Sequence, residues 1–396
     1  MALISLRKNL RTGLAALLLG ISSGCAELKY YSNLVEGHAE ILFNKQSIEE
    51  VLEDSQVDEE TKQKLRLVQD VRKYAIEKLH LPDTGAYTDY VDLDKIVNTE
   101  QNAKEEQKAE ETAKEEQEYI AVFITACRSL KFEVKEWWYP FVGTQRMRTF
   151  YDKEEAEAYA EELEHEGWDI EISETYAYST GKFLNNPLLG ESLGDLVTNV
   201  MLAQNDAHLI EYLFHEMAHQ LVYIDEDTTF NESFAEFVGE EGARQYLEDH
   251  QQKDIQQKDH QQKFPETLTE KQMKRMDDDL FYEIITAYRG WLDLLYNSPL
   301  PDEEKFQKKK KIFQAMKDTY LREAQPLGAG KEWWFAQKLN NAHLITVQEY
   351  FDYVDEFAAL FEHAAYRNWE EFYDIVQNIS EWPDTKRKEF LRNFYK

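Results

Sequence analysis

The stretch of residues 213–242 constrains this chain more than any other, because it contains two metal-binding side chains at helical spacing. His215-Glu216-Met217-Ala218-His219 is an H-E-x-x-H pattern. Its two histidines stand four residues apart, so they project from one face of an α-helix about one turn apart and can grip one Zn²⁺. Glu216 points roughly 100° round the helix, away from the coordination sphere but within reach of a water on the metal. The pattern therefore predicts a helix that carries two zinc ligands and a general base.

A hydrolytic zinc site needs a third protein ligand and keeps one position for water, whose pKa falls to about 7 on the metal. No histidine follows His219 in residues 220–225, so we expect a carboxylate. Glu232 lies on a second amphipathic stretch and is the predicted third ligand. Glu236, one turn later, is expected to accept the outer N–H of a ligand histidine and so to hold its tautomer. This Asn-Glu arrangement resembles the His₂Glu sites of the gluzincins, the thermolysin-like zincins.

Apolar residues surround both stretches. Twelve residues separate His219 from Glu232, which predicts a tight connection between the two helices. The flanking apolar residues at helical spacing are Leu213, Phe214, Met217, Ala218, Leu221 and Val222 in the first stretch, and Phe230, Phe234, Phe237 and Val238 in the second. Ionisable groups on such embedded helices are costly unless they are paired or bind a metal. The alternative is a chance H-E-x-x-H on a merely polar helix.

The first 24 residues predict a signal for export. Arg7, Lys8 and Arg11 precede a short apolar run at residues 14–19, and Gly24-Cys25 resembles the end of a bacterial lipobox. Cys25 is then expected to carry lipid at the mature N-terminus, and the alternative is an ordinary cleaved signal. Ala26 after this cysteine favours the periplasmic side of the outer membrane in a Gram-negative cell. The chain is therefore predicted to be a lipid-anchored protein of the bacterial cell envelope.

The net charge argues against a nucleic-acid-binding protein, and the cysteine content argues against a disulfide-stabilised one. The formal net charge is −32, which makes nucleic acid an unsuitable partner. With Cys25 lipidated, Cys127 is the only remaining cysteine, so no intramolecular disulfide can form. Cys127 lies in an apolar run and is expected to be a buried thiol.

The pattern along the chain predicts an α+β fold that is mainly α-helical and zincin-like, with a small sheet at about 119–185 and a helical C-terminal block. The expected divisions are a signal peptide at 1–24, a helical region at 25–98, a charged low-complexity insertion at 99–118, a catalytic core at 119–247, a Gln/Lys-rich insertion at 248–264 and a helical region at 265–396. The two insertions contain almost no apolar residues and are expected to lie on the surface.

Three further residues are candidates for contact with substrate or an oxyanion. Tyr178 lies just upstream of the H-E-x-x-H helix, in a segment that would border the substrate groove and pair with an extended peptide. Asn340 and His343 interrupt the C-terminal helical pattern with polar groups. The alternatives are an ordinary tyrosine at 178, and a helix-capping asparagine with a satisfied histidine at 340–343.

Motifs spread over much of the chain resemble the predicted aminopeptidase family of bacterial lipoproteins. They are residues 24–25, 30–31, 79–82, 176–180, 187–189, 215–223, 227–228, 230–235 and 340–342. The resemblance implies a zinc-dependent peptidase with His215, His219 and Glu232 as ligands and Glu216 as base. Two other functions share these residues or this location: an endopeptidase or cell-wall peptide amidase, and a non-catalytic binding lipoprotein of the cell envelope.

Overall fold

The structure is a computed structural model that describes residues 25–95, 119–139, 143–175, 195–225, 227–257, 268–328 and 330–394. Helices dominate these residues, and the strands form three small sheets. The prediction of a mainly α-helical α+β protein is confirmed.

Helices form most of the N-terminal region, as predicted for residues 25–98. They are α2 (Cys25–Phe43), α3 (Ile48–Glu53) and α4 (Glu59–Glu77). Asp58 caps α4, because its side chain accepts a hydrogen bond from the backbone N–H of Thr61 at 2.8 Å. The turn at 81–85 follows α4 and leads into β2 (Asp89–Val91).

The sheet expected at about 119–185 is present. Its antiparallel order is β6-β3-β7, and α6 (Lys153–His165) packs on it. The strands of this region are β3 (Ala121–Arg128), β4 (Trp137–Tyr139), β5 (Gly143–Gln145), β6 (Met147–Phe150) and β7 (Trp168–Thr175). β4 and β5 form a separate hairpin. Cys127 of β3 is fully buried in a cluster with Ala342 and Ile345 of the C-terminal region, and burial raises the pKa of its thiol to about 12. The predicted buried thiol is therefore confirmed.

A further small sheet was not predicted from the sequence. β2 lies between β1 (Gln46–Ser47) and β8 (Val197–Thr198), antiparallel to the first and parallel to the second. It brings the segment after α4 against the segment that leads through α7 (Asn199–Leu202) into α8 (Asp206–His219). The N-terminal region is thereby joined to the H-E-x-x-H helix.

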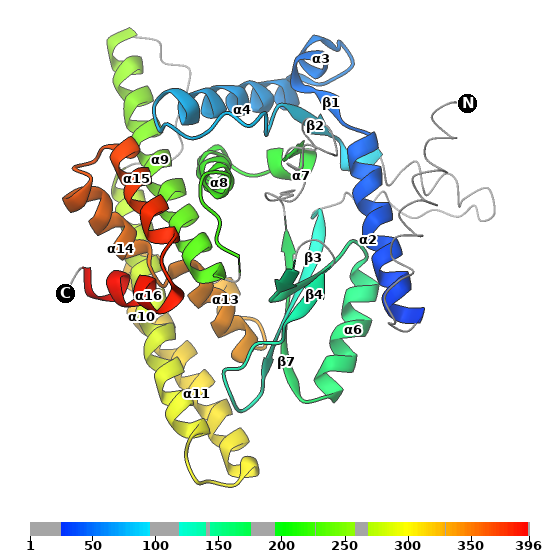
Figure 1. The fold of residues 1–396 in the computed structure, drawn as a ribbon, viewed down its shortest axis with the longest axis vertical. Coiled ribbons are helices and arrows are strands. Elements are labelled where there is room, and N and C mark those ends of the chain that lie inside the picture. The colour runs from blue at the N-terminus through cyan, green and yellow to red at the C-terminus, as the bar shows by residue number, and fades with distance from the viewer. Residues whose placement is uncertain are drawn as a thin grey trace.

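The C-terminal part is helical, as predicted. Its elements are α10 (Leu268–Tyr296), α11 (Asp302–Glu323), η2 (Gln325–Leu327), α12 (Glu332–Phe335), α13 (Asn341–Phe351), α14 (Val354–Ala359), η3 (Leu360–Ala364), α15 (Trp369–Ser380) and α16 (Asp384–Phe394). α10 and α11 form a hairpin that extends from the body of the molecule (Figure 1).

The H-E-x-x-H helix lies in the largest apolar cluster of the described chain. This cluster joins α8 and α9 (Thr228–Gln257) to α4 on one side and to α14, α15 and α16 on the other (Figure 1). The β6-β3-β7 sheet has its own cluster with α6 and Tyr30 of α2. Packing therefore connects the helices of the site to helices of both the N-terminal and the C-terminal region.

Several predicted features lie partly or wholly outside the described residues. The signal peptide at 1–24 is outside them, as are 176–180 and the whole of the 99–118 insertion. α9 continues to Gln257, ten residues into the stretch that was predicted as the second insertion. The described residues contain no helix that is both long and apolar enough to cross a membrane.

Candidate metal centre

Helix α8 presents both predicted histidines on one face. It begins after Asn205, whose side chain accepts the backbone N–H of His208 at 2.9 Å, and ends at His219. Its opposite face buries Ile210, Phe214 and Met217 among other apolar residues. Because this face is anchored in the core, the position of the two imidazoles is set by packing along the whole helix.

Helix α9 carries Glu232 and Glu236 and packs closely on α8. A Cβ at Gly239 would lie only 3.0 Å from the carbonyl oxygen of Glu211 and 3.2 Å from Cβ of His215. A side chain there would meet the backbone of α8, which cannot rotate aside. Gly239 therefore allows the close approach that brings the carboxylates of α9 to the histidines of α8, a role that no local sequence pattern indicates.

The three predicted ligands form a triangle. Nε2 of His215 lies 3.2 Å from Nε2 of His219 and 3.3 Å from Oε2 of Glu232, and the third side, between His219 and Glu232, is 3.6 Å. Four tetrahedral ligands about 2.1 Å from zinc stand about 3.4 Å apart, so the three sides match that spacing. Two imidazoles and a carboxylate are also ligand types that zinc prefers. The residues present fit a zinc ion.

The two histidines favour the ionised form of Glu232, which is the form that binds a metal. Burial by itself raises its pKa, but the nearby charges of His219 and His215, with their hydrogen bonds, bring the pKa well below its usual value. Burial by itself lowers the pKa of His215, and hydrogen bonds to Glu232 and Glu236 more than reverse this. A metal ion is bound by the neutral imidazole, so a cation at the triangle would have to displace a proton from His215.

The outer nitrogens of the two histidines differ. Nδ1 of His215 lies 3.2 Å from Oε2 of Glu236, the arrangement predicted for the second carboxylate of α9. Nδ1 of His219 is buried and has no hydrogen-bond partner among the described residues. Glu236 therefore orients His215, whereas His219 is oriented by its position at the end of α8.

Glu216, the predicted base, lies on α8 next to the triangle and is 9% exposed. No hydrogen bond joins its carboxylate to another described residue. A buried carboxylate beside a cation site is placed to accept a proton from water there.

The short loop between α8 and α9 is held by two contacts that the sequence did not predict. The side chain of Asn231 accepts the N–H of Ile224 and donates to its carbonyl, both at 2.8 Å. Asp227 forms a buried ion pair with Arg387 of α16, whose Nε lies 2.9 Å from the carboxylate. No local sequence pattern indicates this pair, because its two members lie 160 residues apart. These contacts fix the tight connection that the spacing predicted.

Asn340 and His343 lie in a different network. Asn340 caps α13, accepts the N–H of Ala342 at 2.9 Å and donates to the carbonyl of Ile170 in β7 at 2.7 Å. His343 donates from Nδ1 to Oδ1 of Asn340, and burial lowers its pKa to about 4. These hydrogen bonds do not reach the triangle. Tyr178 lies outside the described residues, and Cys25 is the first residue of α2.

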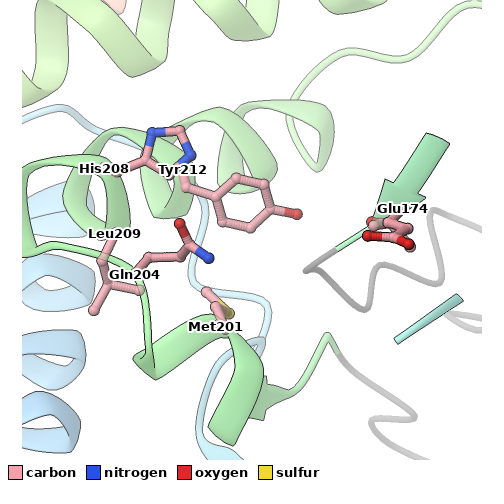
Figure 2. Close-up of a pocket in the computed structure, with 7 residues that line it drawn as sticks. Glu174, Met201, Gln204, His208, Leu209 and Tyr212 are labelled. Atoms are coloured by element: carbon pink, nitrogen blue, oxygen red, sulfur yellow. The ribbon is translucent and has the colours of Figure 1, made fainter. Parts of the chain in front are cut away.

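A pocket of about 190 Å³ continues along the ligand-bearing face of α8. It is lined by Glu174, Thr175, Met201, Gln204, His208, Leu209 and Tyr212 (Figure 2). His208 and Tyr212 share the face of His215 and His219, and the ring of Tyr212 is nearly parallel to that of His215 at 6.4 Å. Since a cavity of about 150 Å³ can hold a benzene ring, this pocket has room for a substrate side chain beside the triangle.

The sequence matches the family described as "Putative aminopeptidase" over residues 29–101 and 98–391. The comparisons with curated proteins and with solved structures found no match.

Proposed function

The chain belongs to the family described as "Putative aminopeptidase", and from that premise we propose that it is a zinc-dependent peptidase. The observation that carries the proposal is the triangle of His215, His219 and Glu232, with sides of 3.2 to 3.6 Å. A zinc ion held there would polarise the scissile carbonyl and lower the pKa of a water to about 7.

Glu216 performs the proton transfers in this proposal. Its carboxylate takes a proton as the water oxygen bonds to the carbonyl carbon, and it delivers that proton to the amide nitrogen as the C–N bond breaks. Glu236 holds His215 through Nδ1, so that Nε2 is directed toward the proposed metal position. The pocket beside Tyr212 receives the side chain next to the cleaved bond.

The family description and the pocket favour different positions of cleavage in a peptide. The description favours an aminopeptidase, which must hold a free α-amine. Glu174, the carboxylate of the pocket, already forms an ion pair with Nζ of Lys153 at 2.7 Å, so a free α-amine would compete with that lysine. That pair favours the second candidate, an endopeptidase or a cell-wall peptide amidase, at the same site.

One experiment separates these functions. The purified protein is analysed for metal, loaded with zinc and offered matched free-amine, N-blocked and cell-wall peptides. Glu216→Gln should retain zinc and lose at least about 10²-fold in turnover. Glu248→Gln is the control, because Glu248 is a partly exposed glutamate of α9 that pairs with Arg244. Appreciable turnover by Glu216→Gln would overturn the role of the base, and stoichiometric zinc without any cleavage would favour a binding protein.

We also propose that Cys25 is lipidated and anchors the protein in the bacterial cell envelope. The proposal rests on the basic and apolar residues before Gly24-Cys25. Mass spectrometry of the mature N-terminus tests it, since a cleaved N-terminus without lipid would refute the anchor.

A further inference from the structure

Tyr87 has a backbone conformation that a large side chain rarely adopts. It lies between α4 and β2 with φ of 58°, in the left-handed region that favours glycine. Its side chain is only 1% exposed, and its N–H donates to the carbonyl of Asp195 at 2.7 Å. Strained conformations of this kind persist where the surrounding structure enforces them, and they concentrate at functional sites.

The hydroxyl of Tyr87 is buried and has no hydrogen-bond partner among the described residues. A buried tyrosine usually finds such a partner, because an unsatisfied polar group opposes folding. Tyr373 is the other tyrosine of the described chain with a buried, unpartnered hydroxyl. Tyr373 packs against Phe234, Trp369 and Phe372, on the side of α9 that faces α15.

Tyr87 lies against the face of α8 that carries Glu216. Asp195, which receives the N–H of Tyr87, accepts a hydrogen bond from Nε2 of Gln220 at 2.9 Å. Gln220 follows Glu216 by four residues, so both project from the same side of the helix. After burial itself, the charges of Asp195 and Glu216 raise the pKa of Tyr87 further above its usual value. The hydroxyl therefore stays protonated and can donate a hydrogen bond.

We infer that Tyr87 is a positioning residue for Glu216: its hydroxyl donates to one carboxylate oxygen and leaves the other oxygen for the water. Core packing holds the ring of Tyr87, so the side chain of Glu216 is the partner that moves to form the bond. A general base needs this anchoring, because a freely rotating carboxylate spends little time aimed at the water. The inference rests on the proposed peptidase function.

Tyr87→Phe tests it, because the change removes only the hydroxyl oxygen, and Tyr373→Phe is the matched control. Both variants should unfold at the same temperature as wild type or higher, since each loses an unsatisfied buried group. Zinc content should not change in either. Tyr87→Phe should lower kcat about 10-fold or more with little change in KM, whereas Tyr373→Phe should keep wild-type kcat.

The second test measures whether the effects of Tyr87→Phe and Glu216→Gln on kcat depend on each other. A tyrosine with a purely structural role would show no such dependence. Tyr87→Phe should cause no further loss in a Glu216→Gln background, because the group that it positions is already absent. Equal effects of Tyr87→Phe in both backgrounds, or a kcat equal to that of Tyr373→Phe, would overturn the inference.

A spectroscopic arm keeps the test independent of turnover. The phenol O–H infrared band of Tyr87 in the zinc-loaded protein is identified as the band that Tyr87→Phe removes. This band should shift in Glu216→Gln and remain in place in Glu248→Gln. If the wild type cleaves no peptide, the proposed function fails while this band still decides the inference. A band that Glu216→Gln leaves unchanged overturns it.

Discussion

Gly239 offers a direct test of how the two ligand helices are held together. A methyl group at this position would lie 3.0 Å from a carbonyl oxygen of α8 and 3.2 Å from Cβ of His215. Both atoms are attached to the core-anchored helix and cannot move alone. Gly239→Ala must therefore push α9 away from α8 by a few tenths of an ångström.

The magnitude follows from two opposing terms. Alanine is favoured over glycine within a helix by about 1 kcal/mol. Overpacking a close contact costs about 1–3 kcal/mol. Gly290 in α10 separates the terms, since a Cβ there meets no atom within 4 Å. Gly290→Ala should gain the helix term alone, so Gly239→Ala should be about 1–3 kcal/mol less stable than Gly290→Ala.

The assay has two parts. Urea unfolding in the presence of a chelator measures the free energy of unfolding of the metal-free variants. Competition with a chromophoric chelator measures zinc affinity. The ligand atoms of α8 and α9 would separate, and metal sites tolerate only about 0.2 Å of error, so Gly239→Ala should bind zinc about 10–100-fold more weakly. Gly290→Ala should bind it as wild type does. Equal stability of the two variants together with unchanged zinc affinity would refute the close-approach argument.

Two further predictions concern buried charge away from the triangle. Arg387→Met should lower the free energy of unfolding in urea by about 3–5 kcal/mol, because it leaves Asp227 buried without its cation. Lys388→Met breaks only an exposed pair with Asp384 and should lower it by less than about 1 kcal/mol. Similar losses of stability in both variants would contradict the ion-pair argument. The folded-state pKa of His343, about 4, lies below its ordinary 6.5 because burial opposes the charge, so its neutral form supports folding fully above pH 6.5 and loses that support as the pH falls. Relative to His343→Gln, the wild type should lose roughly 3 kcal/mol between pH 7 and pH 4, and parallel pH curves would show that His343 does not titrate in this way.

Local spacing accounts for what the sequence predicted. The four-residue interval between His215 and His219 places them on one face of any α-helix, and the interval between Glu232 and Glu236 does the same. Apolar periodicity correctly predicted the helices α8 and α9, and the apolar run around Cys127 correctly predicted its burial. These features depend on contacts within one or two helical turns, which short stretches of sequence already specify.

Spacing did not predict which groups of distant segments meet. Glu236 contacts His215 rather than His219, and Gly239 allows that contact, because of how α9 lies on α8. The polar residues at 340–343 were recognised, but their pairing with β7 was not.

By itself, the sequence determined the helix that carries His215, Glu216 and His219, because helical geometry is the same wherever the helix lies. Only the tertiary structure decided what surrounds that helix: Arg387 at the loop, and Tyr87, whose N–H donates to the carbonyl of Asp195. Their partners lie more than 100 residues away along the chain, and no periodic pattern encodes the packing of α4 and the C-terminal helices that brings them together.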